Sequence, residues 1–340
     1  MKRWTAGDRQ YDLVEGWGEL PDGWRWGQVA GVATDSEDNV HVFTRTEHPY
    51  MVFDKAGKLI DHWGEGIFGM AHGVCVTPDN STYFIDQGGH IVMKFSRQGR
   101  HQLTLGNRDK PSDTGYSPEI REPDASDPSI PGGEPGSRTE ALSMINGVAH
   151  AGAPFNQPTD LAVDAAGNIY VSDGYRNCRV HKFGPDGALI KSWGEPGNAK
   201  ELRGTKEKPG YFHTPHGISV HEHKVFVSDR ENNRIQIFTL DGDFLDMWTG
   251  YLRPTKLYVD PNEAVMYVSE LDDRVSIVDL DGNTLGRLGP GHVPGKIDGG
   301  RSHDPGEFYG PHCIWRDSEG AIYVGEVLEG RRLQKFARQK

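Results

Sequence analysis

The sequence predicts an all-β protein, a six-bladed β-propeller with four strands in each blade. Three observations lead to this prediction. A four-stranded pattern recurs roughly every 40 residues, the turns are rich in Asp-Gly and Pro-Asp pairs, and no stretch keeps a helical period. With 44 glycines and 21 prolines, the 340-residue chain favours many short strands over long helices. We expect residues 1–340 to form one ring.

The clearest copy of the repeat runs from Thr159 to Glu195. Its first two strands flank the turn 165–168, and its last two strands flank Pro185-Asp186-Gly187. Each strand is short and either alternating or apolar, as half-buried and core strands require. Five other stretches follow the same pattern, which gives six blades. The copies begin near Gly31, Gly73, Asp160, Gly217, Lys256 and Cys313.

The last copy lacks a fourth strand, because its pattern stops at Phe336. The segment Leu13–Glu19 ends in Trp-Gly-Glu, as do the fourth strands that run up to Glu65 and Glu195. We therefore expect this amino-terminal segment to complete the sixth blade. Such closure removes the open strand edges that an incomplete ring would present.

Two stretches interrupt the repeat. Residues 107–156 are rich in Pro, Gly, Ser and Asp and form a long loop between the second and third blades in this prediction. Its more apolar end, Met144–His150, either forms a lid or belongs to a plain surface insert. The stretch Pro290–Phe308 is predicted to be a second loop on the rim.

A short phrase with a histidine recurs in every second copy. Alternate blades of a closed six-bladed ring lie a third of a turn apart, so these three side chains are expected to converge on the axis. Three neutral imidazoles with an open fourth position form a common catalytic zinc site, and imidazole also binds other divalent transition metals. The competing interpretation is three unrelated histidines beside strand starts. The aligned residues are Ala30, His72, Thr159, His216, Thr255 and His312.

Three polar residues follow second strands, on the side of the ring where the first strands start. They are Arg45, Tyr175 and Arg230, and they could surround the metal. Arginine offers a planar fork for a carboxylate, and a tyrosine beside cations can act as a base. The alternative is that all three are ordinary surface residues.

An acidic residue ends the second strand in most blades, and an arginine follows it a few residues later. A feature that recurs in most blades indicates architecture rather than catalysis, and we expect ion pairs within blades. Cys313 adjoins a predicted ligand, but strand alternation points it away, so we interpret it as a packing residue. The pairs are Asp173 with Arg179, Asp229 with Arg234, Glu270 with Arg274, and Glu326 with Arg332.

Composition excludes several function classes. The net charge of -12 argues against nonspecific binding to nucleic acid or to an anionic membrane, and no apolar stretch is long enough to span a bilayer. The segment Met1–Asp8 lacks the apolar region of a secretory signal, and three cysteines make a disulfide framework unfavourable. We expect a cytoplasmic protein with a small-molecule substrate, and the oligomeric state is left open.

The signature Asp-x-x-Asn-x-Arg-Ile at Asp229–Ile235 resembles NHL-repeat propellers. The similarity is closer to one branch, the peptidyl-α-hydroxyglycine α-amidating lyases, and it extends over Gly27–Ala33, Phe155–Val163 and Tyr170–Tyr175. The resemblance implies a six-bladed propeller that cleaves a carbinolamide to glyoxylate and an amide. It also implies site roles, namely a catalytic zinc on His72, His216 and His312, a catalytic arginine at Arg45, a catalytic tyrosine at Tyr175 and a second active-site arginine at Arg230.

The chain departs from that family at two positions. Gly310 stands where the animal members have methionine, and Cys313 stands where they have an acidic ligand of a structural Ca²⁺. The second departure puts a structural Ca²⁺ in doubt. We expect a zinc-dependent lyase that acts on a small carbinolamide-like or α-hydroxy substrate, which carries a carboxylate. The alternatives are a non-catalytic NHL-repeat binding scaffold and a metal-dependent hydrolase or hydratase, for which lactonases are one model.

Overall fold

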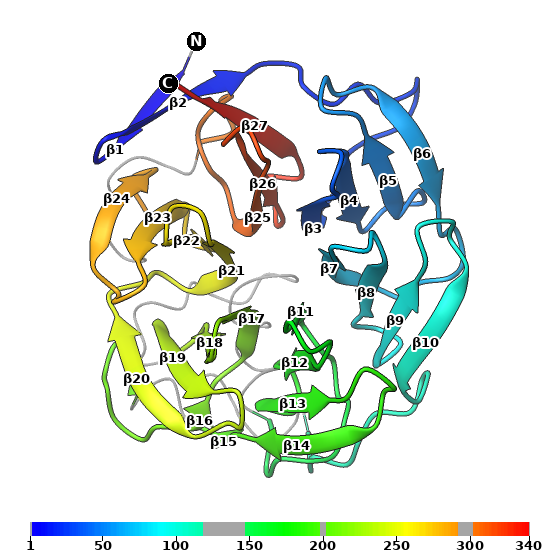
Figure 1. Ribbon diagram of the computed structural model, residues 1–340, viewed down its shortest axis with the longest axis vertical. Helices are drawn as coiled ribbons and strands as arrows, with labels where there is room; N and C mark the ends of the chain where they lie inside the picture. Colours follow the sequence, from blue (N-terminus) through cyan, green and yellow to red (C-terminus); the bar gives the residue numbers. More distant parts are fainter. Residues whose placement is uncertain (1, 118–146, 198–201, 292–301, 340) are drawn as a thin grey trace.

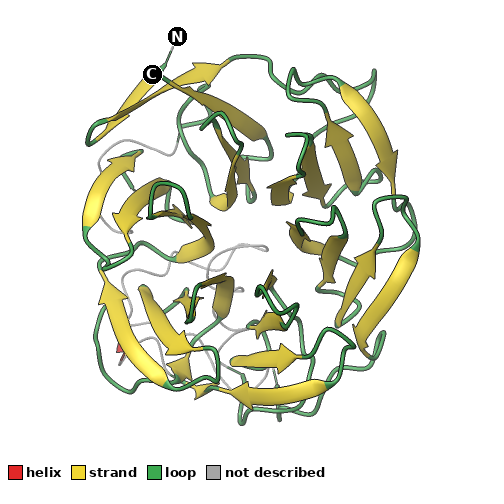
Figure 2. Ribbon diagram, viewed as in Figure 1, coloured by secondary structure: helices red, strands yellow, loops and turns green. Residues whose placement is uncertain are grey.

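The computed structural model describes residues 2–117, 147–197, 202–291 and 302–339, whose strands form six blade sheets arranged as a ring, together with one two-stranded sheet (Figure 1). The first strand of each blade lies nearest the axis, and the outer strands form the rim (Figure 1). Loops join the strands within each blade (Figure 2). The predicted all-β, six-bladed propeller is therefore confirmed. Within the described ranges, the chain contains no helix with the length and apolarity needed to cross a lipid bilayer.

The first three blades follow one another along the chain, and each is a four-stranded antiparallel sheet. Blade 1 consists of β3 (Val29–Thr34), β4 (Val40–Thr44), β5 (Tyr50–Phe53) and β6 (Leu59–Trp63). Blade 2 consists of β7 (Ala71–Val76), β8 (Thr82–Asp86), β9 (Ile91–Phe95) and β10 (His101–Gly106). Blade 3 consists of β11 (Asp160–Val163), β12 (Ile169–Asp173), β13 (Arg179–Phe183) and β14 (Leu189–Trp193).

The remaining blades continue the same pattern, and a short parallel pair of strands, β15 (Glu195–Pro196) and β16 (Tyr211–Phe212), lies between blades 3 and 4 in the sequence. Blade 4 consists of β17 (Pro215–His221), β18 (Lys224–Asp229), β19 (Arg234–Thr239) and β20 (Phe244–Thr249). Blade 5 consists of β21 (Pro254–Asp260), β22 (Val265–Glu270), β23 (Arg274–Asp279) and β24 (Thr284–Leu288). Blade 6 contains β25 (Pro311–Arg316), β26 (Ile322–Glu326) and β27 (Leu333–Arg338).

The amino-terminal segment closes the ring, as predicted, but the strand boundaries differ. The closing strand is β2 (Arg9–Val14), which pairs antiparallel with β27 so that Leu13 lies opposite Phe336. It ends before Trp17, because Gly16 and Gly18 adopt positive φ angles of 73° and 89° and turn the chain. An unpredicted strand, β1 (Arg3–Ala6), pairs with β2 and makes this blade five-stranded.

The apolar core lies between blades rather than inside them. Each of six buried clusters joins two neighbouring blades, and the cluster between blades 1 and 2 is typical. There, Phe43 meets Phe84 edge-on at 5.1 Å between ring centroids, and Tyr50 meets the same ring edge-on at 4.9 Å. Burial of each large side chain contributes about 1.5–3 kcal/mol. These clusters fix the angle between blades, and therefore the position of each inner strand relative to the axis.

The turn between the first two strands uses an aspartate that accepts backbone hydrogen bonds. In blade 3, Asp164 Oδ1 accepts from the backbone N–H of Ala166 at 2.9 Å and of Asn168 at 2.8 Å. Gly167 adopts a φ of 84°, which a side chain would disfavour. This local chemistry explains the recurring Asp-x-x-Gly-Asn pattern and sets the strand register that places the inner strand start.

The two described ends of the insert, residues 107–117 and 147–156, lie side by side. The Ser112 N–H donates to the Phe155 carbonyl at 2.9 Å, and the Thr114 hydroxyl donates to the Arg176 carbonyl on blade 3 at 2.7 Å. The predicted lid, Met144–His150, is described only from Gly147 onward, and in that part Val148 is buried in the cluster between blades 3 and 4. The predicted rim loop, Pro290–Phe308, is described only at residues 290–291 and 302–308. The remaining residues of both stretches lie outside the described residues, so both stay predictions.

Candidate metal centre

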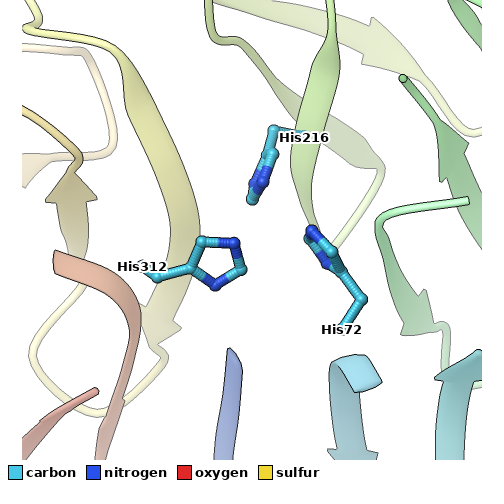
Figure 3. A group of neighbouring side chains, drawn as sticks. All are labelled: His72, His216 and His312. Carbon is cyan, nitrogen blue, oxygen red and sulfur yellow. The ribbon is translucent and has the colours of Figure 1, made fainter. Parts of the chain in front are cut away.

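Three histidines meet on the propeller axis, one from every second blade (Figure 3). His72, His216 and His312 are each the second residue of an inner strand: β7, β17 and β25. Their ring centroids lie 4.7–4.8 Å apart, and one ligand nitrogen from each ring lies within 4.8 Å of the others. All three side chains are buried. The structure therefore brings together the three residues that the sequence pattern singled out.

A bulge in each inner strand aims the histidine at the axis. The pairing register shifts between Ala71 and Val74, between Pro215 and Ile218, and between Pro311 and Cys313. A bulge leaves one residue unpaired and redirects its side chain, which is why bulges are common beside functional sites.

Backbone carbonyls of the intervening blades orient the rings. The Nδ1 of His72 donates to the Thr159 carbonyl at 2.6 Å, and the Nδ1 of His216 donates to the Thr255 carbonyl at 3.1 Å. The Nδ1 of His312 donates to the Ala30 carbonyl at 2.9 Å. Because a carbonyl only accepts, a neutral ring in this arrangement keeps its free lone pair on Nε2. The three acceptor residues, Thr159, Thr255 and Ala30, belong to the blades without an axial histidine. In those blades they occupy the repeat position that aligns with the histidines.

Several features of the three rings fit a metal ion. Burial lowers the pKa of each histidine well below its usual range, and neighbouring charges add to this, Arg230 for His216 and Arg45 for His312. The Nε2 of His312 is buried and has no hydrogen-bond partner within the described residues. Neutral imidazoles that leave Nε2 free form the donor set that Zn²⁺ and similar transition metals prefer. The three residues therefore form a possible metal site.

Carboxylates at the ends of the second strands hold the segments that lead into the inner strands. In blades 2 to 5, such a carboxylate accepts from a backbone N–H three residues before the aligned histidine or threonine. The bonds run from Gly69 to Asp86, Asn156 to Asp173, His213 to Asp229, and Leu252 to Glu270.

The predicted ion pairs within blades form at three of the four positions. Arg234 contacts Asp229, Arg274 contacts Glu270, and Arg332 contacts Glu326. The prediction for Arg179 was wrong. The Nε2 of His181 lies 3.2 Å from Asp173 instead, and Arg179 donates to the Gly152 carbonyl. His181 lies deeper in the blade than Arg179 and is fully buried, so it reaches the carboxylate and displaces the arginine.

Tyr175 lies over two of the three metal-facing nitrogens. Its hydroxyl oxygen is 3.2 Å from Nε2 of His72, 3.3 Å from Nε2 of His216, and 3.1 Å from Nη1 of Arg230. The tyrosine reaches this place because the chain bends tightly at Gly174. A Cβ at Gly174 would lie 1.9 Å from the Pro215 carbonyl oxygen, so only glycine fits there.

The two predicted arginines flank the same tyrosine. Arg45 donates from Nε to the Ala71 carbonyl at 3.1 Å and from Nη1 to Gln28 Oε1 at 2.7 Å. Tyr175 lies close enough to interact electrostatically with the Arg45 guanidinium. Arg230 is buried, and its Nε donates to Glu231 Oε1 at 2.9 Å. The structure thus groups Arg45, Tyr175 and Arg230 around the histidines.

Two residues near the site had no assigned role in the sequence interpretation. Glu231 accepts from Arg230 and also from Nη2 of Arg253 at 2.8 Å, and all three side chains are buried. Arg253 precedes Pro254 at the start of β21. Glu231 lies inside the Asp-x-x-Asn-x-Arg-Ile signature, and this is the sequence feature that could have pointed to it. Nothing local in the sequence distinguishes Arg253, because its contact joins loops of two different blades.

The channel narrows on the other side of the histidines. Lys256 Nζ lies 2.7 Å from both carboxylate oxygens of Asp160, an ion pair that links blades 5 and 3. Next to this ion pair and the histidines, the inner strands line a cavity of only about 10 Å³, room for roughly one water molecule. Beyond Lys256, a separate cavity of about 820 Å³ opens between the far ends of the inner strands. A substrate would therefore reach the histidines from the side of Tyr175. Cys313 is buried and faces the Val29 carbonyl, which agrees with a packing role.

Comparisons with known proteins agree with this architecture. The NHL repeat model matches residues 155–183 and 212–238, which lie in and beside blades 3 and 4, so this β-propeller contains NHL repeats. More particularly, it resembles the peptidyl-α-hydroxyglycine α-amidating lyases. It is 27% identical over 298 residues to amidating lyase 1 of Drosophila melanogaster, which covers 82% of this chain and 47% of that protein. Two of the relatives, from Drosophila melanogaster and Caenorhabditis elegans, are named as amidating lyases, the second as a probable one.

Another relative is much longer than this chain. The peptidyl-glycine alpha-amidating monooxygenase of Mus musculus is 28% identical over 246 residues, which cover 63% of this chain and 21% of that protein. The chain thus spans about a fifth of the length of that relative. Among solved structures, a streptogramin B lyase superposes with a TM-score of 0.59 at 14% identity, and the match covers 99% of this chain and 100% of that one. At that identity the likeness concerns the fold alone.

Proposed function

We propose that this protein is a zinc-dependent lyase of the amidating-lyase type. Its substrate in this proposal is a small carbinolamide that carries a carboxylate. One observation carries the proposal: three buried histidines present Nε2 to the axis, and the Tyr175 hydroxyl lies 3.2 Å from the nearest of them. Two arginines flank the same hydroxyl, and relatives named as lyases support the reaction class.

The metal ligands in this proposal are His72, His216 and His312. Their neutral, carbonyl-bonded rings fit Zn²⁺, although another divalent transition metal would also fit. A bound ion would supply Lewis acidity to the substrate hydroxyl oxygen.

The arginines provide the means to hold an anion. Arg45 and Arg230 bring two positive charges to the side of the histidines from which a substrate would enter, and Arg230 is held in place by Glu231. A guanidinium binds a carboxylate through paired, charge-assisted hydrogen bonds. We therefore assign the substrate carboxylate to this side of the site, where it would fix the orientation of the carbinol carbon.

Tyr175 moves the proton in the proposed reaction. Acting as the base, it takes the proton of the substrate hydroxyl, and a carbon–oxygen double bond forms as the carbon–nitrogen bond breaks. The electron pair of the broken bond leaves with the nitrogen, which receives the proton back. The products are glyoxylate and an amide. Arg230 donates to the phenol oxygen and would stabilise the negative charge on it.

The test is glyoxylate release from N-benzoyl-α-hydroxyglycine. Protein reconstituted with zinc is expected to yield equal amounts of glyoxylate and benzamide, faster than the uncatalysed decay, and chelation is expected to abolish the excess rate. A zinc-loaded protein that leaves this compound at its uncatalysed rate would argue for the alternatives. Lactone and amide hydrolysis assays would then distinguish a hydrolase from a binding scaffold.

A further inference from the structure

A second group of metal-binding side chains lies in blade 1, apart from the axis. His48 lies in the turn between β4 and β5, His62 lies in β6, and Glu65 follows the end of β6. One ligand atom from each residue lies within 4.8 Å of the others. Their side chains are 31%, 47% and 46% exposed, so ions in solution can reach them.

These donors lie close enough to one another to share one ion. The Nδ1 of His48 lies 3.1 Å from Glu65 Oε1, and the Nδ1 of His62 lies 3.4 Å from the same oxygen. Tetrahedral zinc with bonds of about 2.0–2.1 Å places its ligands about 3.3–3.4 Å apart. Two imidazoles and a carboxylate form a recognised set of zinc ligands and leave a fourth position for water.

An aromatic side chain holds both rings in place before any ion binds. The indole of Trp24 stacks on the His48 ring, with centroids 3.5 Å apart and planes 8° apart. The same indole meets the His62 ring at 5.0 Å in a perpendicular arrangement. Rings that are already packed lose less conformational freedom on binding, which favours a site of useful affinity.

We propose that His48, His62 and Glu65 form a second metal site, which binds a divalent transition ion of the Zn²⁺ type. Hydrogen bonds from the imidazoles to Glu65 are the state without the ion, and the ion replaces them with bonds to the same atoms. This site does not depend on the proposed lyase activity, because none of its residues contacts the three axial histidines in the described structure.

An ion at this site would tie together two parts of blade 1. It would join the turn between β4 and β5 to the end of β6. That turn also carries Arg45, which reaches the Ala71 carbonyl and Gln28. If the proposed function holds, the second ion therefore steadies a turn that supplies an anion-binding arginine.

Zinc binding to four proteins tests the proposal: the wild type, His62→Ala, Glu65→Gln and His101→Ala. His101 is a matched control, since it is an exposed histidine outside this cluster. Each protein is stripped with a chelator, checked by circular dichroism and titrated with ZnCl₂ in a calorimeter. The two cluster variants are expected to bind one equivalent fewer than the wild type, or to bind that equivalent at least about 100-fold more weakly. His101→Ala is expected to match the wild type.

The test compares the number of zinc equivalents bound by the wild type with the number bound by each variant. This difference reports on the second site whether or not the axial site binds zinc. Equal stoichiometry and affinity in the wild type and both cluster variants would overturn the second site, as would equal losses in His101→Ala. A variant with alanine at the three axial histidines separates the two proposals: it is expected to lose the axial equivalent and to keep the one at the second site. If this variant loses no zinc, the proposed function fails and the second site stands.

Discussion

The hydroxyl oxygen of Tyr175 lies 3.2 Å from Nε2 of His72, although 103 residues separate them in the chain. This contact joins a residue that follows a second strand in blade 3 to one that begins an inner strand in blade 2. A group that transfers a proton must lie within hydrogen-bond reach of the reacting atoms. A substrate oxygen held near the three Nε2 atoms would therefore lie next to the tyrosine.

Replacement of Tyr175 by phenylalanine removes the hydroxyl and keeps the ring. We expect kcat on N-benzoyl-α-hydroxyglycine to fall by about 10²–10⁴-fold, the usual contribution of general acid–base catalysis. Zinc content is expected to stay at the wild-type value, because the histidines keep their carbonyl partners. Steady-state kinetics and elemental analysis check both points, and unchanged turnover would remove Tyr175 from the mechanism.

Replacement of Arg45 by alanine is expected to act through the substrate carboxylate. A hydrogen bond to a charged group contributes about 1.5–3 kcal/mol, which corresponds to a loss of about 10- to 150-fold in kcat/KM. A substrate analogue with a primary amide in place of the carboxylate is the control, because it lacks the charge that Arg45 would bind. Equal losses on both compounds would show that Arg45 does not recognise the carboxylate.

Replacement of Asp229 by asparagine tests how much the buried carboxylates stabilise the segments that lead into the inner strands. Asp229 and Arg234 are fully buried and 2.7 Å apart, and Asp229 also accepts from the His213 N–H. Removal of one partner of a buried ion pair costs about 3–5 kcal/mol of unfolding free energy. Urea unfolding measures this loss. The control is Glu37→Gln, which breaks an exposed pair with Arg97 and is expected to change stability little.

The three histidines predict how stability of the metal-free protein depends on pH. Burial lowers their pKa values in the folded state below the ordinary value of 6.5. Below about pH 6.5 the unfolded chain therefore binds more protons at these positions than the folded chain, and stability falls as the pH falls. Above that pH all three are neutral in both states and contribute no slope.

Denaturant unfolding at several pH values measures this effect. The reference is a variant with alanine at His72, His216 and His312. The wild type, stripped of metal, is expected to lose more unfolding free energy than this variant between pH 7 and pH 5. Parallel curves for the two proteins would mean that the histidines are not neutral and buried as described.

The fold and the three axial histidines were accessible to sequence reasoning because a propeller repeats one register. Aligned positions in successive blades occupy equivalent places around the axis, so the alternation at His72, His216 and His312 translates directly into convergence. Tyr175 and Arg230 could be placed in the same way, since each follows a second strand. Their contact with the histidines still depends on loop geometry, such as the tight bend at Gly174.

Other contacts could not be predicted from the sequence, because they join segments that do not occupy equivalent positions in the repeat. Arg253 meets Glu231 across two blades, and Trp24 meets His48 and His62 through a segment outside the repeat. The strand β1 had a local signal, the pair Gly7-Asp8, which is typical of a two-residue hairpin turn. The Trp-Gly-Glu ending of Leu13–Glu19 favours a later closing strand, whereas the hairpin at Gly7-Asp8 places the paired strands before it.

The most direct test of the axial metal site is an anomalous diffraction measurement at the zinc absorption edge on crystals of the zinc-loaded protein. We expect a peak on the propeller axis, at about 2.0–2.1 Å from Nε2 of His72, His216 and His312, with the Tyr175 hydroxyl beside it. An axis without an anomalous peak, in a protein that is folded and saturated with zinc, would contradict the central claim that these histidines form a metal centre.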